Sequence, residues 1–168
     1  EPEPTRWEEE KIEQYSLPPR SENWLPFIAD SVTDNRFFVD AASIRVGADG
    51  VVRYILLVKT PQGAENISYE GIRCETREVT RYAFARFDGS WLKARQRGWE
   101  RIEKPEKNRH HIVLYADFFC QEPGRSAEKM IQAQLNGKIR QQFLYEVYLD
   151  TKRKDPYKVT EQVCAKND

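Results

Sequence analysis

The chain has 168 residues, a length that favours a single domain. Its 39% hydrophobic and 12% aromatic residues exclude an intrinsically disordered protein, because such proteins combine few aromatic residues with a high net charge. The 27 basic and 27 acidic residues give a net charge of zero, so nucleic acid is not an expected partner, and no apolar run approaches the roughly 18 residues of a membrane span.

Residues 1–35 form an acidic, Pro-rich segment, with nine acidic residues, three basic residues and five prolines. We interpret this segment as an N-terminal arm that could lie on the body, which has an excess of basic residues, or stay solvated. The large apolar side chains of Trp7 and Trp24 favour docking, since disordered segments seldom carry them. A short helix is predicted over Arg6–Gln14.

Residues 36–150 are predicted to be an α+β core domain that starts with an antiparallel meander. Short segments rich in β-branched and aromatic residues alternate with turn signals, of which Asp88-Gly89 is the strongest. Within Val51–Lys59 apolar residues follow one another, as in a strand covered on both faces. The predicted strands are Arg36–Val46, Val51–Lys59, Asn66–Arg73, Val79–Phe87 and Ser90–Leu92.

The hydrophobic pattern changes after Pro105. Apolar residues over Ile112–Phe119 have helical spacing and predict a helix that packs on the sheet, although the β-branched pair at its start leaves a strand open. A second helix is predicted over Ser126–Asn136, a final strand over Phe143–Leu149, and a charged tail over 151–168. We therefore expect one α+β domain with an antiparallel sheet of four to six strands and two main helices.

The most distinctive stretch runs from Tyr69 to Cys74 and contains a glycine, Gly71, inside a predicted strand. A glycine in a strand indicates a β-bulge or a close approach to the backbone. The stretch could place Glu70 or Arg73 at the mouth of a binding cleft. The alternative is a bulged strand that a disulfide anchors, with no role in binding.

Residues 77–111 hold ten basic and five acidic residues, interleaved with aromatic side chains such as Tyr82 and Trp99. Such a surface could bind single-stranded nucleic acid through phosphate contacts and base stacking, or an anionic polysaccharide, a lipid headgroup or an acidic partner. The acidic N-terminal arm could itself be this partner. The alternative is a solvated charged face whose aromatic residues belong to the core.

Candidates for catalysis are few. His110 and His111 are adjacent and neither has a metal-binding spacing, so we expect no metal site and no cofactor. A thiolate nucleophile, Cys74 or Cys120 beside one of these histidines, is chemically conceivable, but a disulfide would abolish it. The sequence has no phosphate-binding loop, dinucleotide fingerprint or serine-hydrolase motif, and we assign no catalytic residue.

The three cysteines, Cys74, Cys120 and Cys164, leave two redox states open. One is a disulfide with one cysteine left over, and the other is three reduced thiols in a cytosolic protein. The sequence starts Glu-Pro-Glu-Pro without a methionine, which fits removal of a signal peptide.

Several segments between residues 24 and 136 resemble the CNP1-like family of exported proteobacterial proteins, for which no activity is established. The segments that carry the resemblance are Arg36-Phe37, Val39-Asp40, Val46-Gly47, Asp49–Tyr54, Gly63–Asn66, Tyr69–Cys74 and Asp117–Cys120, with Trp91 and Trp99. The resemblance implies a periplasmic or envelope-associated protein with a cleaved signal peptide and a disulfide between Cys74 and Cys120, but no reaction. Cys164 lies outside the resemblance and could link two chains in a dimer.

We therefore expect an exported, non-catalytic binding or interaction module whose partner is an envelope ligand or protein. The candidate binding residues are Asp40, Arg53, Tyr69, Glu70 and Arg73. The alternative function is a small hydrolase-like enzyme that uses residues around Glu70, Cys74 and His111.

Overall fold

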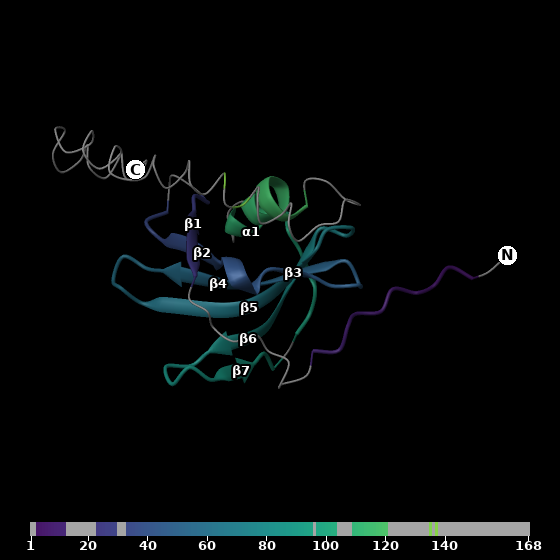
Figure 1. The fold of residues 1–168 in the computed structure, drawn as a ribbon, viewed down its shortest axis with the longest axis horizontal. Helices are drawn as coiled ribbons and strands as arrows, with labels where there is room; N and C mark the ends of the chain where they lie inside the picture. Colours follow the sequence, from purple (N-terminus) through teal and green to yellow (C-terminus); the bar gives the residue numbers. More distant parts are fainter. Residues whose placement is uncertain are drawn as a thin grey trace.

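The computed structural model describes residues 3–12, 23–29, 33–95, 97–103 and 109–120, together with Leu135 and Gly137 (Figure 1). An eight-stranded sheet forms the body, and all of its strand pairs are antiparallel. Its order is β1-β2-β4-β5-β6-β7, while β3 pairs with β4 and β8 pairs with β6. The strands are β1 (Trp24–Phe27), β2 (Arg36–Asp40), β3 (Arg45–Val46), β4 (Val51–Lys59), β5 (Glu65–Arg73), β6 (Glu78–Ala85), β7 (Trp91–Lys93) and β8 (Glu100–Arg101).

The predicted meander is confirmed in β4, β5, β6 and β7, and the chain turns back at Gly89 with a φ of 86°. The predicted strand Arg36–Val46 is interrupted by a 3₁₀ turn, η2 (Ala41–Ser43). The side chain of Asp40 starts this turn by accepting a hydrogen bond from the amide of Ala42 at 3.1 Å. Both halves still pair with β4, so the expected hairpin is present with a break in its first arm.

The expected number of four to six strands is too low. The additional strands β1, β3 and β8 contain only two to four residues each, which is too short for a period-two pattern to stand out. β1 pairs with β2 at the edge of the sheet, although it lies within the segment interpreted as an N-terminal arm. The fold is therefore mostly β.

The predicted helix over Arg6–Gln14 is wrong for residues 6–12, which have no regular secondary structure. Contacts with the body hold this stretch in place, and they replace the hydrogen bonds of a helix. The second predicted helix, Ser126–Asn136, lies outside the described residues except for Leu135, which is helical. The predicted strand Phe143–Leu149, the charged tail and Cys164, with the dimer expected through it, lie outside the described residues.

The helix predicted near Ile112 is confirmed. It starts as α1 (Arg109–Val113) and continues as π-helical turns, η3 (Leu114–Phe119). Its buried residues Leu114, Phe118 and Phe119 join the main core cluster against the sheet, which settles the choice between helix and strand. The disulfide that the family resemblance implies is also present: Cys74 directly after β5 is bonded to Cys120 directly after η3, with a Cα–Cα distance of 5.5 Å.

Side chains of β4 alternate between two core clusters on opposite faces of the sheet. Tyr54 and Leu56 pack in the cluster under α1 and η3, whereas Ile55 and Leu57 pack in a second cluster. We call these the helix face and the arm face, because the N-terminal stretch 3–12 reaches the second cluster through Ile12. In Figure 1, α1 lies beside the β1–β2 end, and the N-terminal stretch approaches from the β6–β7 end.

A β-bulge lies where the glycine in β5 indicated one. The register between β5 and β6 shifts between Tyr69 and Glu70, so that Tyr69 faces Ala83 but Glu70 faces Arg81. Tyr82 is the extra residue. A Cβ atom on Gly71 would lie 2.8 Å from Oη of Tyr82, so the expected close approach is also present and is made by a side chain.

The bulge changes which β6 side chains share a face. Arg81 and Phe84 are three residues apart and would normally point to opposite faces of a strand. The extra residue between them brings both to the helix face, opposite Glu70 and Ser68 respectively. Tyr82 instead points to the arm face, where it contacts Glu9.

Candidate functional site

A pocket of about 530 Å³ opens on the helix face, between β2, β4, β5, β6 and the start of α1. Its volume lies in the range of roughly 300 to 1,000 Å³ that is typical of small-molecule sites. The lining combines apolar side chains with several polar groups. The polar side chains that matter most below are Asn35, Asn66, Ser68, Glu70, Arg81 and His110.

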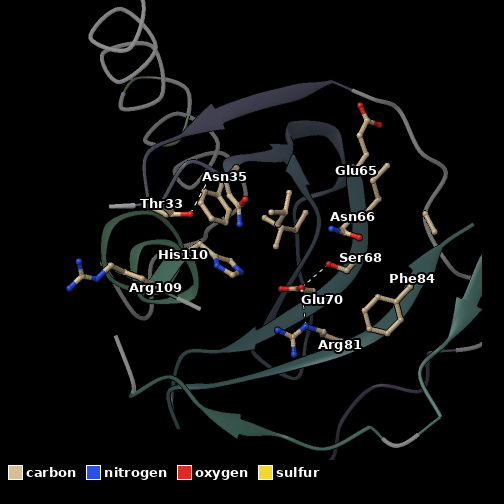
Figure 2. Close-up of a pocket in the computed structure, with 16 residues that line it drawn as sticks. Thr33, Asn35, Glu65, Asn66, Ser68, Glu70, Arg81, Phe84, Arg109 and His110 are labelled. Atoms are coloured by element: carbon tan, nitrogen blue, oxygen red, sulfur yellow. Dashed lines mark hydrogen bonds and ion pairs between the residues drawn. The ribbon is translucent and has the colours of Figure 1, made fainter. Parts of the chain in front are cut away.

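The carboxylate of Glu70 lies in this pocket and is almost completely buried, with 1% exposure. Its Oε1 accepts hydrogen bonds from the Tyr54 hydroxyl at 2.9 Å and from Nε2 of His111 at 2.6 Å. Its Oε2 accepts a hydrogen bond from the Ser68 hydroxyl at 2.7 Å and pairs with Nε of Arg81 at 3.5 Å. Figure 2 shows the Ser68 and Arg81 interactions as dashed lines that meet at Glu70. Both carboxylate oxygens are therefore fully engaged.

These partners keep Glu70 ionised. Burial alone would raise its pKa, but the charge and hydrogen bond of His111, with Arg81 and Ser68, outweigh burial and lower the pKa to about 2. Burial and the neighbouring carboxylate together raise the pKa of the Tyr54 hydroxyl, which therefore remains a hydrogen-bond donor. Because the carboxylate can only accept, Nε2 of His111 carries a proton.

The two adjacent histidines have different surroundings. His110 stacks on Phe37 with a ring-centroid distance of 4.8 Å, and its ring points towards the pocket in Figure 2. Burial, with a smaller contribution from His111, lowers the pKa of His110 to about 3, so this ring is neutral at ordinary pH. His111 lies deeper, and its buried Nδ1 has no hydrogen-bond partner among the described residues.

The described residues at the pocket do not form a nucleophile paired with a base. Cys74 is held in a disulfide and provides no thiolate. The hydroxyl of Ser68 donates to Glu70, and so does the imidazole of His111, so the serine and the histidine share an acceptor and do not form a nucleophile–base pair. Glu70 holds donors in position, and its own oxygens have no free lone pair directed at a ligand.

The arm face carries a second cluster, in which the acidic N-terminal stretch docks on basic residues. Glu9 accepts hydrogen bonds from the Tyr82 hydroxyl and from Arg97, both at 2.7 Å. Arg53, which is buried, pairs with Asp49 at 2.6 Å and lies 4.0 Å from Glu9. The expectation that the arm would be a partner of residues 77–111 is therefore confirmed for these contacts.

Trp7 fixes the same stretch through its indole ring. The guanidinium of Arg73 lies 3.8 Å from the ring centroid, and the ring meets Trp99 edge to face at 6.0 Å. Its Nε1 donates to the backbone oxygen of Asp49 at 2.8 Å. The aromatic residue Trp7 and the acidic residues Glu9 and Glu10 thus anchor the arm.

The five predicted binding residues do not form one site. Glu70 lies in the pocket on the helix face. Arg53 and Arg73 lie under the arm on the other side, where Tyr69 packs against Tyr82 at 5.3 Å. Asp40 caps the η2 turn. Of the residues named for the hydrolase alternative, Glu70 and His111 are brought together, and Cys74 is in the disulfide.

Sequence reasoning missed most of the pocket. Ser68 is two residues before Glu70 and shares its face, which strand alternation could have indicated. Arg81 reaches this face only because of the bulge, whose position on β6 has no sequence signal. Asn35, directly before β2, and Asn66, near the start of β5, come from the same end of two strands that flank β4, which only the strand order of the sheet reveals.

Metal binding has no support in the described part of the chain. Across residues 3–12, 23–29, 33–95, 97–103 and 109–120, no group of three or more His, Cys, Asp or Glu side chains is placed to hold an ion. In the same residues, no helix has the length and apolar character needed to cross a membrane.

A family model matches residues 2–136, which is most of the chain. The chain belongs to the CNP1-like family. The match spans the sheet, the pocket, both cysteines of the disulfide and the N-terminal stretch that docks on the arm face. Comparisons with curated proteins and with solved structures found no match.

Proposed function

We propose that this CNP1-like protein is a non-catalytic binding module of the cell envelope, and that the pocket on the helix face is its ligand site. The observation that carries the proposal is the buried network around Glu70. A carboxylate that accepts from Tyr54, Ser68 and His111 and pairs with Arg81 is a rigid support for polar groups at the pocket wall. Rigid polar groups in an otherwise partly apolar cavity are typical of small-molecule sites.

Export is part of the proposal. Disulfides persist in oxidising compartments and are rare in the cytosol, so the bond between Cys74 and Cys120 supports a periplasmic or envelope location. The same bond holds the end of the helical segment, which provides His110 to the pocket, against the end of β5, which provides Glu70. A reducing compartment would loosen this connection.

The hydrolase-like alternative retains one supporting observation, the close pairing of Glu70 with His111 at 2.6 Å. A carboxylate–imidazole pair can orient a general base. Here, however, the thiol is in a disulfide, and the nitrogen of His111 that would face a nucleophile points at the carboxylate. The binding function is therefore the better-supported proposal.

A fragment screen monitored by amide resonances in two-dimensional NMR tests the proposal. We expect binding fragments to shift resonances of Asn66, Ser68 and Phe84, which line the pocket. Asn66→Trp, at an exposed lining position, should fill the pocket and remove these shifts. Lys93→Trp, at an exposed position on β7 that does not line this pocket, is the matched control and should leave them unchanged. Fragments that shift only resonances elsewhere would refute the assignment of the site.

A further inference from the structure

Arg81 is a cation of the pocket that a buried carboxylate holds in place. Its Nε faces the carboxylate of Glu70, while its side chain is 33% exposed and that of Glu70 only 2%. One edge of the guanidinium is thus directed at a buried anion, and the side chain also lines the cavity. A guanidinium fixed through Nε keeps its two terminal nitrogens as a planar pair of donors, which matches the oxygens of a carboxylate or phosphate.

The charged groups around the pocket leave Arg81 as the cation that an anionic ligand would meet at the buried network. The charged lining residues are two cations, Arg81 and Arg109, and two anions, Glu65 and Glu70. Glu65 is paired with Lys59 at 3.4 Å, and Glu70 is paired with Arg81. In Figure 2 the side chain of Arg109 extends away from Glu70, which leaves Arg81 as the cation beside the buried network.

A cationic ligand fits less well. An amine would need a carboxylate with free acceptor capacity, but both oxygens of Glu70 already accept from protein donors. Glu70 therefore acts as a positioning residue for Arg81 and not as a ligand contact.

The bulge in β6 supports the same interpretation. β-Bulges commonly re-aim side chains next to binding sites. Here the bulge brings Arg81 and Phe84 onto one face, and the ring of Phe84 is 41% exposed at the pocket. A fixed cation beside an exposed aromatic ring suits a ligand that has an anionic group attached to a ring or other partly apolar body.

We propose that the pocket binds small molecules that carry a carboxylate or phosphate group, with Arg81 as the anchoring cation and Glu70 as the residue that positions it. This inference rests on the proposed function of the pocket as a ligand site. It adds the chemical class of the ligand and the residue that selects it.

Three sugars with the same ring test the proposal: glucose, glucuronate and glucose 6-phosphate. They share a pyranose that can pack on Phe84 and differ in one group, which is a hydroxyl, a carboxylate or a phosphate. We expect the acids to bind about tenfold to a hundredfold more tightly than glucose, since hydrogen bonds to a charged group contribute about 1.5 to 3 kcal/mol. The readout is an NMR titration of the oxidised protein that follows the amide resonances and the Nε–H resonance of Arg81.

Three variants separate the contributions of Arg81 and Phe84 to the binding of these sugars. Arg81→Gln should remove the preference for the acids, and Arg86→Gln, an exposed arginine outside the pocket, is the matched control that should retain it. Phe84→Ala should weaken all three sugars by the same factor. If Arg81→Gln does not fold, the Arg81 Nε–H resonance of the wild type still decides the question, because only the acids should shift it.

Each outcome bears on the proposal. Tight binding of glucuronate alone, or of glucose 6-phosphate alone, supports it and identifies the anionic group. Equal binding of all three sugars in the pocket overturns the anionic ligand class and leaves the proposed binding function intact. No shift of any pocket resonance with any of the three sugars overturns the inference, and the fragment screen then tests the pocket independently.

Discussion

The substitution Glu70→Gln tests the network on which the site depends. Glutamine has almost the same shape, so the effect on the free energy of unfolding measures the charge and the acceptor capacity of the carboxylate. With its amide oxygen towards Tyr54 and His111, glutamine keeps two hydrogen bonds but weakens them, because their acceptor is no longer charged. Its NH₂ group then replaces the oxygen that pairs with Arg81 and accepts from Ser68, so the bond to Ser68 becomes a neutral one in which the hydroxyl accepts.

The expected loss follows from these contacts. Hydrogen bonds to charged groups contribute about 1.5 to 3 kcal/mol and neutral ones about 0.5 to 1.5 kcal/mol, so three weakened bonds amount to roughly 3 kcal/mol. Arg81 is one-third exposed, and solvent screens the loss of its ion pair, so we add nothing for it. A protein of this size would then melt about 6 to 12 °C lower.

Urea denaturation followed by tryptophan fluorescence measures this loss near neutral pH. Glu65→Gln is the matched control on the same strand, because Glu65 is half exposed and pairs with the exposed Lys59. We expect the control to change the free energy of unfolding by less than about 1 kcal/mol. A Glu70→Gln protein that is as stable as the control would refute the reasoning.

Three further predictions follow from particular contacts. His110→Phe keeps the stack on Phe37 but cannot be protonated. Between pH 6.5 and about 3 the unfolded wild type binds a proton at His110 that the folded state does not, because the pKa of His110 falls from 6.5 to about 3 on folding. The free energy of unfolding of the wild type, measured by urea denaturation at several pH values, should therefore fall by up to about 5 kcal/mol through this window, and that of the variant should fall by less. Equal slopes for the two proteins would contradict the low pKa. In the same assay, the free energy of unfolding of the double variant Cys74→Ser/Cys120→Ser should be about 4 kcal/mol lower, since the disulfide closes a loop with a sequence separation of 46 residues. A decrease below about 1 kcal/mol would be inconsistent with this account. In Trp7→Ala, the backbone amide of Glu10, which donates to Asp49, should exchange with deuterium about tenfold to a hundredfold faster, because the indole no longer holds the arm on the body. The amides of β4 should stay protected. Unchanged exchange at Glu10 would show that the indole does not hold the arm.

The central strands could be predicted because their signals are local. Val51–Lys59 contains the unbroken apolar run Tyr54–Val58 and becomes β4, which is buried on both faces over most of its length. Gly71 indicated the irregular pairing of β5, since a side chain at that position would collide with Tyr82. Both inferences depend only on the properties of a strand and its immediate neighbours.

The remaining features depend on contacts between segments distant in the sequence. The stretch around Trp7 is rich in charged residues and poor in helix-breaking residues, which suggested a helix. In the structure, contacts of Trp7 with Arg73 and Trp99 hold the stretch without regular secondary structure. Arg53 and Glu70 looked equivalent as charged residues in neighbouring strands. The register of β4 and β5 pairs Arg53 with Gly71, one residue from Glu70, so strand alternation places Arg53 and Glu70 on opposite faces. This divides the predicted site into a pocket and an arm contact.

The most direct test of the central claim, that Glu70 holds Arg81 as the anion anchor of the pocket, is a crystal structure of the oxidised protein with glucuronate. We predict the ligand carboxylate on the terminal nitrogens of Arg81, with the contacts of Glu70 to Ser68 and His111 preserved. A carboxylate bound away from Arg81, or an empty pocket at saturating glucuronate, would contradict the account.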